Sequence, residues 1–173
     1  MAPWWVLRTC RDCKLGNSCC AEVQQFAVWE KGAEDESGFV GHCYLDLFPR
    51  GMALRQPCLC YTLTFHSEGK FSHAAVWPLF PGYELPNGKR HYPLMAMVAN
   101  LAKPTPDRPA LIRHEDVTTF FHEMGHVFHG LLSRTRYSRF HGTAVAPDFV
   151  EAPSQMLENW SVVASPWFRN YGG

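Results

Sequence analysis

The feature that most constrains the fold of this chain is an apolar pattern between residues 117 and 132. Apolar side chains recur there at i, i+3, i+4 and i+7, the spacing of one stripe on an amphipathic helix. The stripe consists of Val117, Phe120, Phe121, Met124, Val127, Phe128, Leu131 and Leu132. Asp116 stands just before it, and its carboxylate could accept the orphan N–H groups of a first turn. The sequence therefore predicts a helix over about 116–132 with Asp116 as the N-cap.

This predicted helix contains an HExxH motif, His-Glu-Met-Gly-His at residues 122–126. His122 and His126 are four residues apart, so both imidazoles leave one face of the helix, one turn apart. Two ring nitrogens at this spacing can reach one zinc ion at about 2.0–2.1 Å. Glu123 lies beside them and would act as general base on a water that the zinc activates, without being a ligand itself. The alternative is a pair of solvated histidines on an ordinary helix.

A zinc site of this kind needs a third protein ligand. The longer HExxHxxGxxH pattern is absent, because His129 and Leu132 stand where the glycine and the third histidine would be. A second helix is predicted from about Asp148, with Pro153 tolerated in its first turn. Its expected apolar face consists of Phe149, Ala152, Met156, Trp160 and Val163. This helix is the natural source of the missing ligand.

Two glutamates lie on this second predicted helix, opposite its expected apolar face. Glu151 and Glu158 are seven residues apart, which is two turns along one side of a helix. One could bind the zinc, while the other orients a ligand histidine through its free ring N–H. The spacing does not decide between them, and Glu158 could equally be a solvated carboxylate. His129 is expected to pack or face solvent rather than bind metal. His141 is expected to be a satisfied loop histidine, with a substrate contact as the alternative.

The region before the connector at residues 103–109 has the character of strands. Residues 23–29 and 39–48 are rich in aromatic and β-branched side chains and are predicted to form a hairpin. Residues 71–79 suggest another strand, stopped by Pro78 and by Pro81-Gly82. The apolar run within 93–101 fits either a buried strand or a short helix. Together these segments predict a small antiparallel or mixed sheet.

Composition narrows the choice of partners and compartment. The chain has 173 residues and a formal net charge of zero, which gives no electrostatic reason to expect nucleic acid or an anionic membrane surface as a partner. A secretion signal and an apolar membrane span are not recognisable, so we expect an intracellular protein without membrane association. The prediction is a cytoplasmic monomer, with mitochondria as the alternative compartment.

The chain has seven cysteines. Cys10 and Cys13 form a CxxC, which is half of a zinc knuckle, but Cys58 and Cys60 do not have the spacing of the second half. An odd count without a secretion signal also argues against a disulfide framework. We therefore expect reduced, unpaired thiols, and a zinc module built on the N-terminal cysteines remains a distant alternative.

Two stretches together resemble a known family. Residues 121–129, Phe-His-Glu-Met-Gly-His-Val-Phe-His, and residues 148–160, Asp-Phe-Val-Glu-Ala-Pro-Ser-Gln-Met-Leu-Glu-Asn-Trp, are similar to the thimet oligopeptidase or saccharolysin-like family of zinc metallopeptidases, peptidase family M3. The second stretch favours the cytosolic oligopeptidase branch over the mitochondrial processing branch. Segments within 46–50, 68–75 and 97–105 resemble the region that precedes the zinc helix in this family.

The resemblance implies a role for each matching residue. His122 and His126 would be zinc ligands, Glu151 the third ligand and Glu123 the general base, with one Zn²⁺ per chain. The implied fold is mainly α with a small β-sheet and a zincin-type two-helix metal core, as a fragment of a larger helical oligopeptidase catalytic domain. The implied function is that of a zinc-dependent metalloendopeptidase that hydrolyses peptide bonds in short peptides.

The resemblance does not cover the whole chain. It makes 23–160 a partial metallopeptidase catalytic domain and leaves 1–22, 51–67 and 161–173 unmatched. Our hypothesis is that the unmatched pieces are translated introns or products of a faulty gene model. Family members also stabilise the oxyanion with a Tyr and a His from a later segment, which has no counterpart here. The alternative function is therefore a truncated, catalytically weak or inactive zinc-binding fragment.

Overall fold

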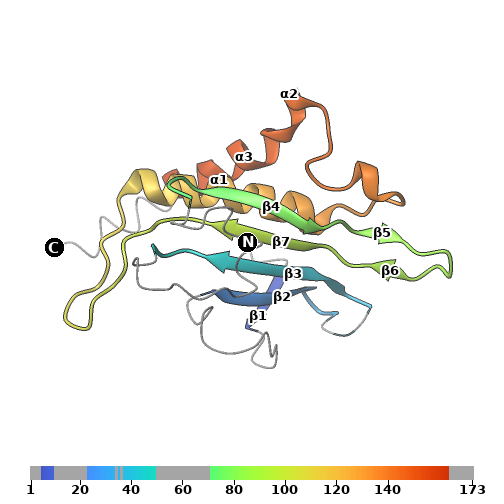
Figure 1. Ribbon diagram of the computed structural model, residues 1–173, viewed down its shortest axis with the longest axis horizontal. Helices are drawn as coiled ribbons and strands as arrows, with labels where there is room; N and C mark the ends of the chain where they lie inside the picture. The colour runs from blue at the N-terminus through green and yellow to red at the C-terminus, as the bar shows by residue number, and fades with distance from the viewer. Residues whose placement is uncertain (1–4, 10–22, 34, 36, 50–70, 164–173) are drawn as a thin grey trace.

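A computed structural model of the chain describes residues 5–9, 23–33, 35, 37–49 and 71–163. Their centre is a mixed five-stranded sheet with the order β1-β2-β3-β7-β4, and the helices lie on one face of it (Figure 1). The strands are β1 (Trp5–Thr9), β2 (Gln24–Glu30), β3 (Phe39–Asp46), β4 (Ala75–Phe80) and β7 (Leu94–Val98). Within this sheet β3 and β7 run parallel, and the other neighbours are antiparallel. A separate ribbon of β5 (Tyr83–Glu84) and β6 (Arg90–His91) extends beyond it.

The predicted mixed sheet is confirmed, with some differences in its strands. The strands β2 and β3 form the expected hairpin, and the run within 93–101 is the buried strand β7 rather than a helix. Pro78 does not stop β4, which continues to Phe80 and ends directly before Pro81-Gly82, the other predicted stop. Because β4 is the last strand in the sheet order, a proline without an N–H is tolerated there. The strand β1 lies in a stretch where the sequence shows no clear periodicity.

The HExxH motif lies on α1, His114–Leu132. The expectation that Asp116 caps this helix is wrong, because the helix begins two residues earlier and Arg113 occupies the N-cap without a side-chain cap bond. The Asp116 carboxylate instead accepts hydrogen bonds from the Arg113 guanidinium, with Nε and Oδ2 3.1 Å apart. The Asp116 side chain still lies in the first turn, where its negative charge interacts favourably with the positive end of the helix dipole.

The predicted apolar stripe of α1 packs against the sheet. Val127 is fully buried and Leu131 is 2% exposed, and both belong to one core cluster with Met95 and Met97 of β7. Gly130 allows this close packing, because a Cβ there would collide with the Met95 side chain. The stripe therefore fixes α1 on the sheet and leaves the histidine face of the helix directed elsewhere.

The second predicted helix is divided at Glu151. A short α2, Pro147–Val150, precedes it, and α3, Ala152–Val163, follows it. Pro153 falls in the first turn of α3, as expected. Glu151 therefore belongs to neither helix, and its backbone conformation (φ −88°, ψ −8°) connects the two.

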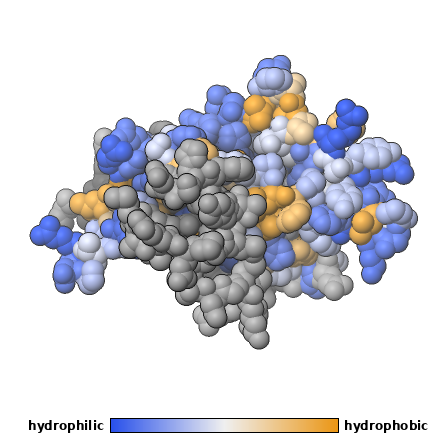
Figure 2. Space-filling view, viewed as in Figure 1, coloured by the Kyte–Doolittle hydropathy of each residue, from blue (hydrophilic) through white to orange (hydrophobic). Residues whose placement is uncertain are grey.

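The prediction of which side chains form the packed apolar face of the second helix is wrong. Met156 and Trp160 are 60% and 57% exposed, and Phe149 of α2 is 55% exposed. Figure 2 shows an apolar patch in the region of α2 and the start of α3. Among the side chains of α3 that the structure describes, Ser154 and Ser161 are buried, at 0% and 2% exposed. Such small residues let α3 lie very close to α1, which longer apolar side chains would prevent.

The described part of the chain contains about as many residues in strands as in α-helices. The expectation of a mainly α fold is therefore not met by these residues, which form a small sheet covered by α1, with α3 packed on α1. Among the described residues, the structure contains no helix that is long and apolar enough to cross a membrane.

Candidate metal centre

Three side chains converge on one point between α1 and the junction of α2 and α3. Glu151 Oε2 lies 3.3 Å from His122 Nε2 and 3.2 Å from His126 Nε2. Four ligands at 2.0–2.1 Å around a tetrahedral zinc ion are about 3.3 Å from one another. The observed separations therefore fit the donor set of one zinc ion, and the chemistry of the set, two imidazoles and a carboxylate, also suits it.

The helix geometry of α1 places the two histidines. His122 and His126 are one turn apart, with ring centroids 5.0 Å apart and the ring planes at 80°. Their side chains are 26% and 13% exposed, so the site lies at a partly covered surface. Glu151 reaches both rings because it lies at the break between α2 and α3, where its carboxylate can turn back over α1.

Glu158 contacts the far side of the first histidine. Its Oε1 atom lies 2.6 Å from His122 Nδ1. A carboxylate at this position favours a proton on Nδ1 and leaves Nε2, the atom that faces Glu151, with a free lone pair. The two glutamates that their spacing alone could not tell apart thus occupy different places, one at Nε2 and the other at Nδ1 of the same ring.

Glu123 lies next to the two histidines on α1 and is half-buried. Burial raises the pKa of its carboxyl group, and the charges of His126 and His122 partly oppose that shift. The arrangement keeps this carboxyl group close to the site, while none of the described hydrogen bonds joins it to the histidine rings.

Gly125 and Ser154 are site-forming residues that the sequence did not identify. A Cβ on Gly125 would lie within 3 Å of the Ser154 Cα atom and of the Pro153 carbonyl oxygen. Ser154 in turn donates its hydroxyl toward Glu151 Oε2 at 2.8 Å. The signal that could have revealed the serine is a repeated Glu-x-x-Ser, Glu151 with Ser154 and Glu158 with Ser161.

Two other histidines near α1 lie outside the converging group. His129 is half-buried with its ring edge-on to Phe149, at a centroid distance of 6.0 Å. His141 is 5% exposed in the loop after α1. Burial lowers the pKa of both rings. The contact of His129 with Phe149 agrees with a packing role. The expectation of a satisfied loop histidine is not met by His141, because its Nε2 atom is buried without a hydrogen-bond partner among the described residues.

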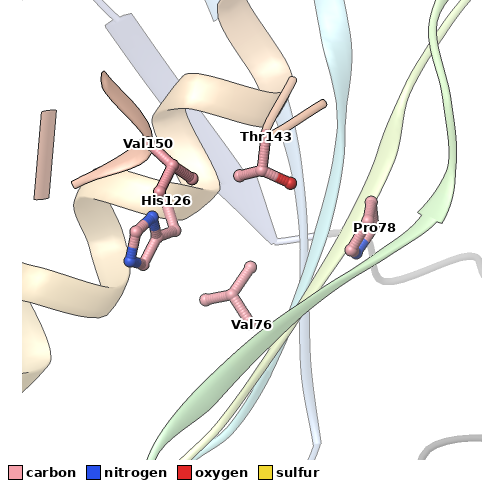
Figure 3. A pocket seen from close by; sticks show the side chains of 5 residues that line it. All are labelled: Val76, Pro78, His126, Thr143 and Val150. Carbon is pink, nitrogen blue, oxygen red and sulfur yellow. The ribbon is translucent and has the colours of Figure 1, made fainter. Parts of the chain in front are cut away.

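A pocket of about 150 Å³ opens beside the second histidine (Figure 3). Val76 and Pro78 of β4 line one side, while His126 of α1 lies across from them. Thr143 and Val150 complete the lining. The pocket therefore lies between the edge strand of the sheet and the histidine face of α1.

The cysteine alternative falls on residues that the structure does not describe. Cys10, Cys13, Cys58 and Cys60 all lie outside the described ranges. Cys43 of β3 is a free thiol buried in the core, 1% exposed. It therefore takes no part in the converging group.

The sequence model of peptidase family M3 matches residues 9–166. The chain belongs to peptidase family M3. The expected resemblance is thereby confirmed, and the match includes the whole of the converging site.

The similarity of this M3 chain to individual proteins supports the family assignment. The chain is 49% identical over 155 residues to the thimet-like oligopeptidase of Dictyostelium discoideum, covering 85% of this chain and 20% of that protein. It is 40% identical over 150 residues to saccharolysin of Saccharomyces cerevisiae, covering 86% and 18%. A mitochondrial intermediate peptidase of Arabidopsis thaliana is 31% identical over 126 residues, covering 73% and 15%. The M3 chain thus spans about a fifth or less of the length of these relatives.

Proposed function

We propose that this M3 chain carries the zinc site of an oligopeptidase that hydrolyses peptide bonds in short peptides. The observation that carries the proposal is the convergence of His122 Nε2, His126 Nε2 and Glu151 Oε2 at the separations that one zinc ion needs. Membership of a peptidase family supports the reaction class. In this proposal His122, His126 and Glu151 are the protein ligands, and Glu158 orients His122.

A bound zinc would supply a Lewis acid that polarises the scissile carbonyl and activates a water molecule. What the chain's own residues contribute to the reaction is proton transfer. Glu123 lies beside the two histidines, and its burial raises its pKa, as suits a group that accepts a proton and then passes it to the leaving amine. Glu123 is therefore the proposed general base.

The sheet edge offers a place for the substrate. The strand β4 is the last strand in the sheet order, and its Val76 and Pro78 line the pocket beside His126. An extended peptide could add to this edge through main-chain hydrogen bonds, which accept many sequences. Pro78 provides no N–H donor, so we expect the bonds to come from its neighbours.

The second candidate function is that of a zinc-binding fragment with weak or no turnover. The observation that favours it is the length of the match, because the chain spans only about a fifth of its oligopeptidase relatives. The cytoplasmic compartment, the mitochondrial alternative and the monomeric state remain predictions.

The deciding experiment measures zinc content and peptide hydrolysis on the same 173-residue chain. We expect about one zinc per chain after dialysis, lost in Glu151→Ala. Glu123→Gln should keep the zinc and lower hydrolysis on the order of 10²–10⁴-fold. Glu115→Gln, an exposed glutamate on the same helix, serves as the control. Zinc binding without hydrolysis in the unaltered chain would favour the inactive fragment, and absence of zinc would contradict both functions.

A further inference from the structure

We propose that Ser154 is a positioning residue that holds the Glu151 carboxylate toward the two histidines. Ser154 Oγ lies 2.8 Å from Glu151 Oε2, the same oxygen atom that lies 3.3 Å from His122 Nε2 and 3.2 Å from His126 Nε2. The inference rests on the proposed zinc site, since it concerns the third ligand of that site.

Glu151 needs such a contact because little else fixes its side chain. The side chain is 46% exposed and extends from the break between two helices. A glutamate of this kind has three rotatable bonds, and ordering them costs conformational entropy. A hydrogen bond that selects one orientation before the metal arrives reduces the ordering that metal binding must provide.

The Ser154 side chain is well suited to this task because it is completely buried, at 0% exposed. Its hydroxyl has one hydrogen and two acceptors within reach, the Glu151 carboxylate at 2.8 Å and the Glu151 carbonyl at 2.9 Å. A charged carboxylate is the stronger acceptor. Both acceptors belong to Glu151, so the buried hydroxyl stays paired with this residue whichever of the two oxygens accepts.

The position of Ser154 is also tied to the histidines through the backbone. Its Cα atom lies so close to Gly125 that a Cβ on the glycine would collide with it. Gly125 is the residue between Glu123-Met124 and His126 in the HExxH motif. The hydroxyl that holds Glu151 therefore has a fixed position relative to the turn of α1 that carries the proposed ligand nitrogens.

Ser161 provides a matched control on the same helix. It is buried to a similar extent, at 2% exposed, and it also donates to a carbonyl three residues earlier, that of Glu158, at 2.7 Å. Its second contact is Thr118 Oγ1 at 3.0 Å, and none of the hydrogen bonds described for it reaches a carboxylate. Replacing either serine by alanine removes one buried hydroxyl from the α1–α3 contact, but only Ser154→Ala removes the bond to Glu151.

The test measures zinc affinity by competition with a chelating dye for the full chain and its variants. Ser154→Ala should weaken zinc binding on the order of 10-fold, the lower end of what loss of an outer partner costs a metal site. Ser161→Ala should change the affinity far less. Urea unfolding of the metal-free proteins shows whether the two alanine variants are folded equally well.

A double-mutant cycle separates positioning from general loss of structure. In the Glu151→Ala background, the weaker zinc binding that remains at the two histidines is measured at zinc concentrations high enough to load it. There Ser154→Ala should have no further effect on zinc affinity, because the group that it positions is gone. An equal effect in both backgrounds, or an affinity unchanged by Ser154→Ala alone, would overturn the inference while leaving the zinc site in place. Failure of the unaltered chain to bind zinc would overturn the proposed function and this inference together.

Discussion

The imidazole of His122 is held between two carboxylates: its Nδ1 atom lies 2.6 Å from Glu158 Oε1, while its Nε2 atom faces Glu151. The consequence is that one ring nitrogen is committed to a hydrogen bond and the other is left to face the converging site. A metal-binding histidine is usually arranged in this way, because the outer bond fixes both tautomer and ring orientation. His126 differs, since its Nδ1 atom is buried without a hydrogen-bond partner among the described residues.

The contact between His122 and Glu158 predicts the effect of removing the Glu158 carboxylate. Glu158→Ala should weaken zinc affinity on the order of 10–100-fold, because His122 would lose the partner that orients it. The measurement is chelator competition with the purified chain. Glu115→Ala is the control, since Glu115 is an exposed helix carboxylate that pairs with Arg113 instead. Equal affinities for Glu158→Ala and the unaltered chain would contradict the orienting role.

Two glycines of α1 are predicted to differ in their tolerance of a methyl group. A Cβ at Gly125 meets backbone atoms of Pro153 and Ser154, whereas one at Gly130 meets the flexible side chain of Met95. Gly125→Ala should therefore destabilise the metal-free chain by about 1–3 kcal/mol or more, and Gly130→Ala should cost less. Urea unfolding checks both. The reverse order would show that α1 and α3 can separate at little cost.

The burial of α3 predicts which apolar side chains matter for stability. Met156 is 60% exposed, so Met156→Ala should change the free energy of unfolding by no more than about 0.5 kcal/mol. Leu131 of α1 is 2% exposed in the core, and Leu131→Ala should cost about 2–5 kcal/mol. Denaturant titration of both variants makes the comparison. A large loss from Met156→Ala would mean that this face of α3 is covered in solution.

The buried thiol of β3 is predicted to be chemically inert. Burial raises the pKa of Cys43 to about 12, so almost no thiolate is present near pH 8. Iodoacetamide should leave Cys43 unmodified in the folded chain and alkylate it after unfolding in urea, with mass spectrometry of the peptides as the readout. Rapid alkylation under native conditions would show that the β3 region opens readily.

Much of the site was predictable because it depends on local geometry. The spacing of His122 and His126 puts both rings on one face of any α-helix, and the apolar stripe of α1 shows which face packs on the sheet. The motifs at 121–129 and 148–160 were also enough to indicate the family that the comparisons show. These properties depend only on residues close together in the chain.

The secondary structure was predictable where periodicity was strong and less so at the ends and edges. The hairpin of β2 and β3 and the long helix α1 are confirmed, but Asp116 is not the N-cap, because the helix begins at His114 with Arg113 at the N-cap. Pro78 also misleads, since a proline stops a central strand but is tolerated in an edge strand. The place of β4 in the sheet order is set by strands distant in the sequence and is not visible in the local pattern.

The sequence by itself determined the helix, the face with the two histidines and the family. Only the tertiary structure decided which glutamate faces which nitrogen of His122, and which side of α3 is buried. The physical reason is that Gly125 and Ser154 let the backbones of α1 and α3 lie very close together, so that small side chains occupy the tightest point of the contact. Leu157 of α3 packs, partly buried, against the core. Helical periodicity places Glu151 and Glu158 near one another along the chain, but this close approach of two helix backbones sets where their carboxylates lie.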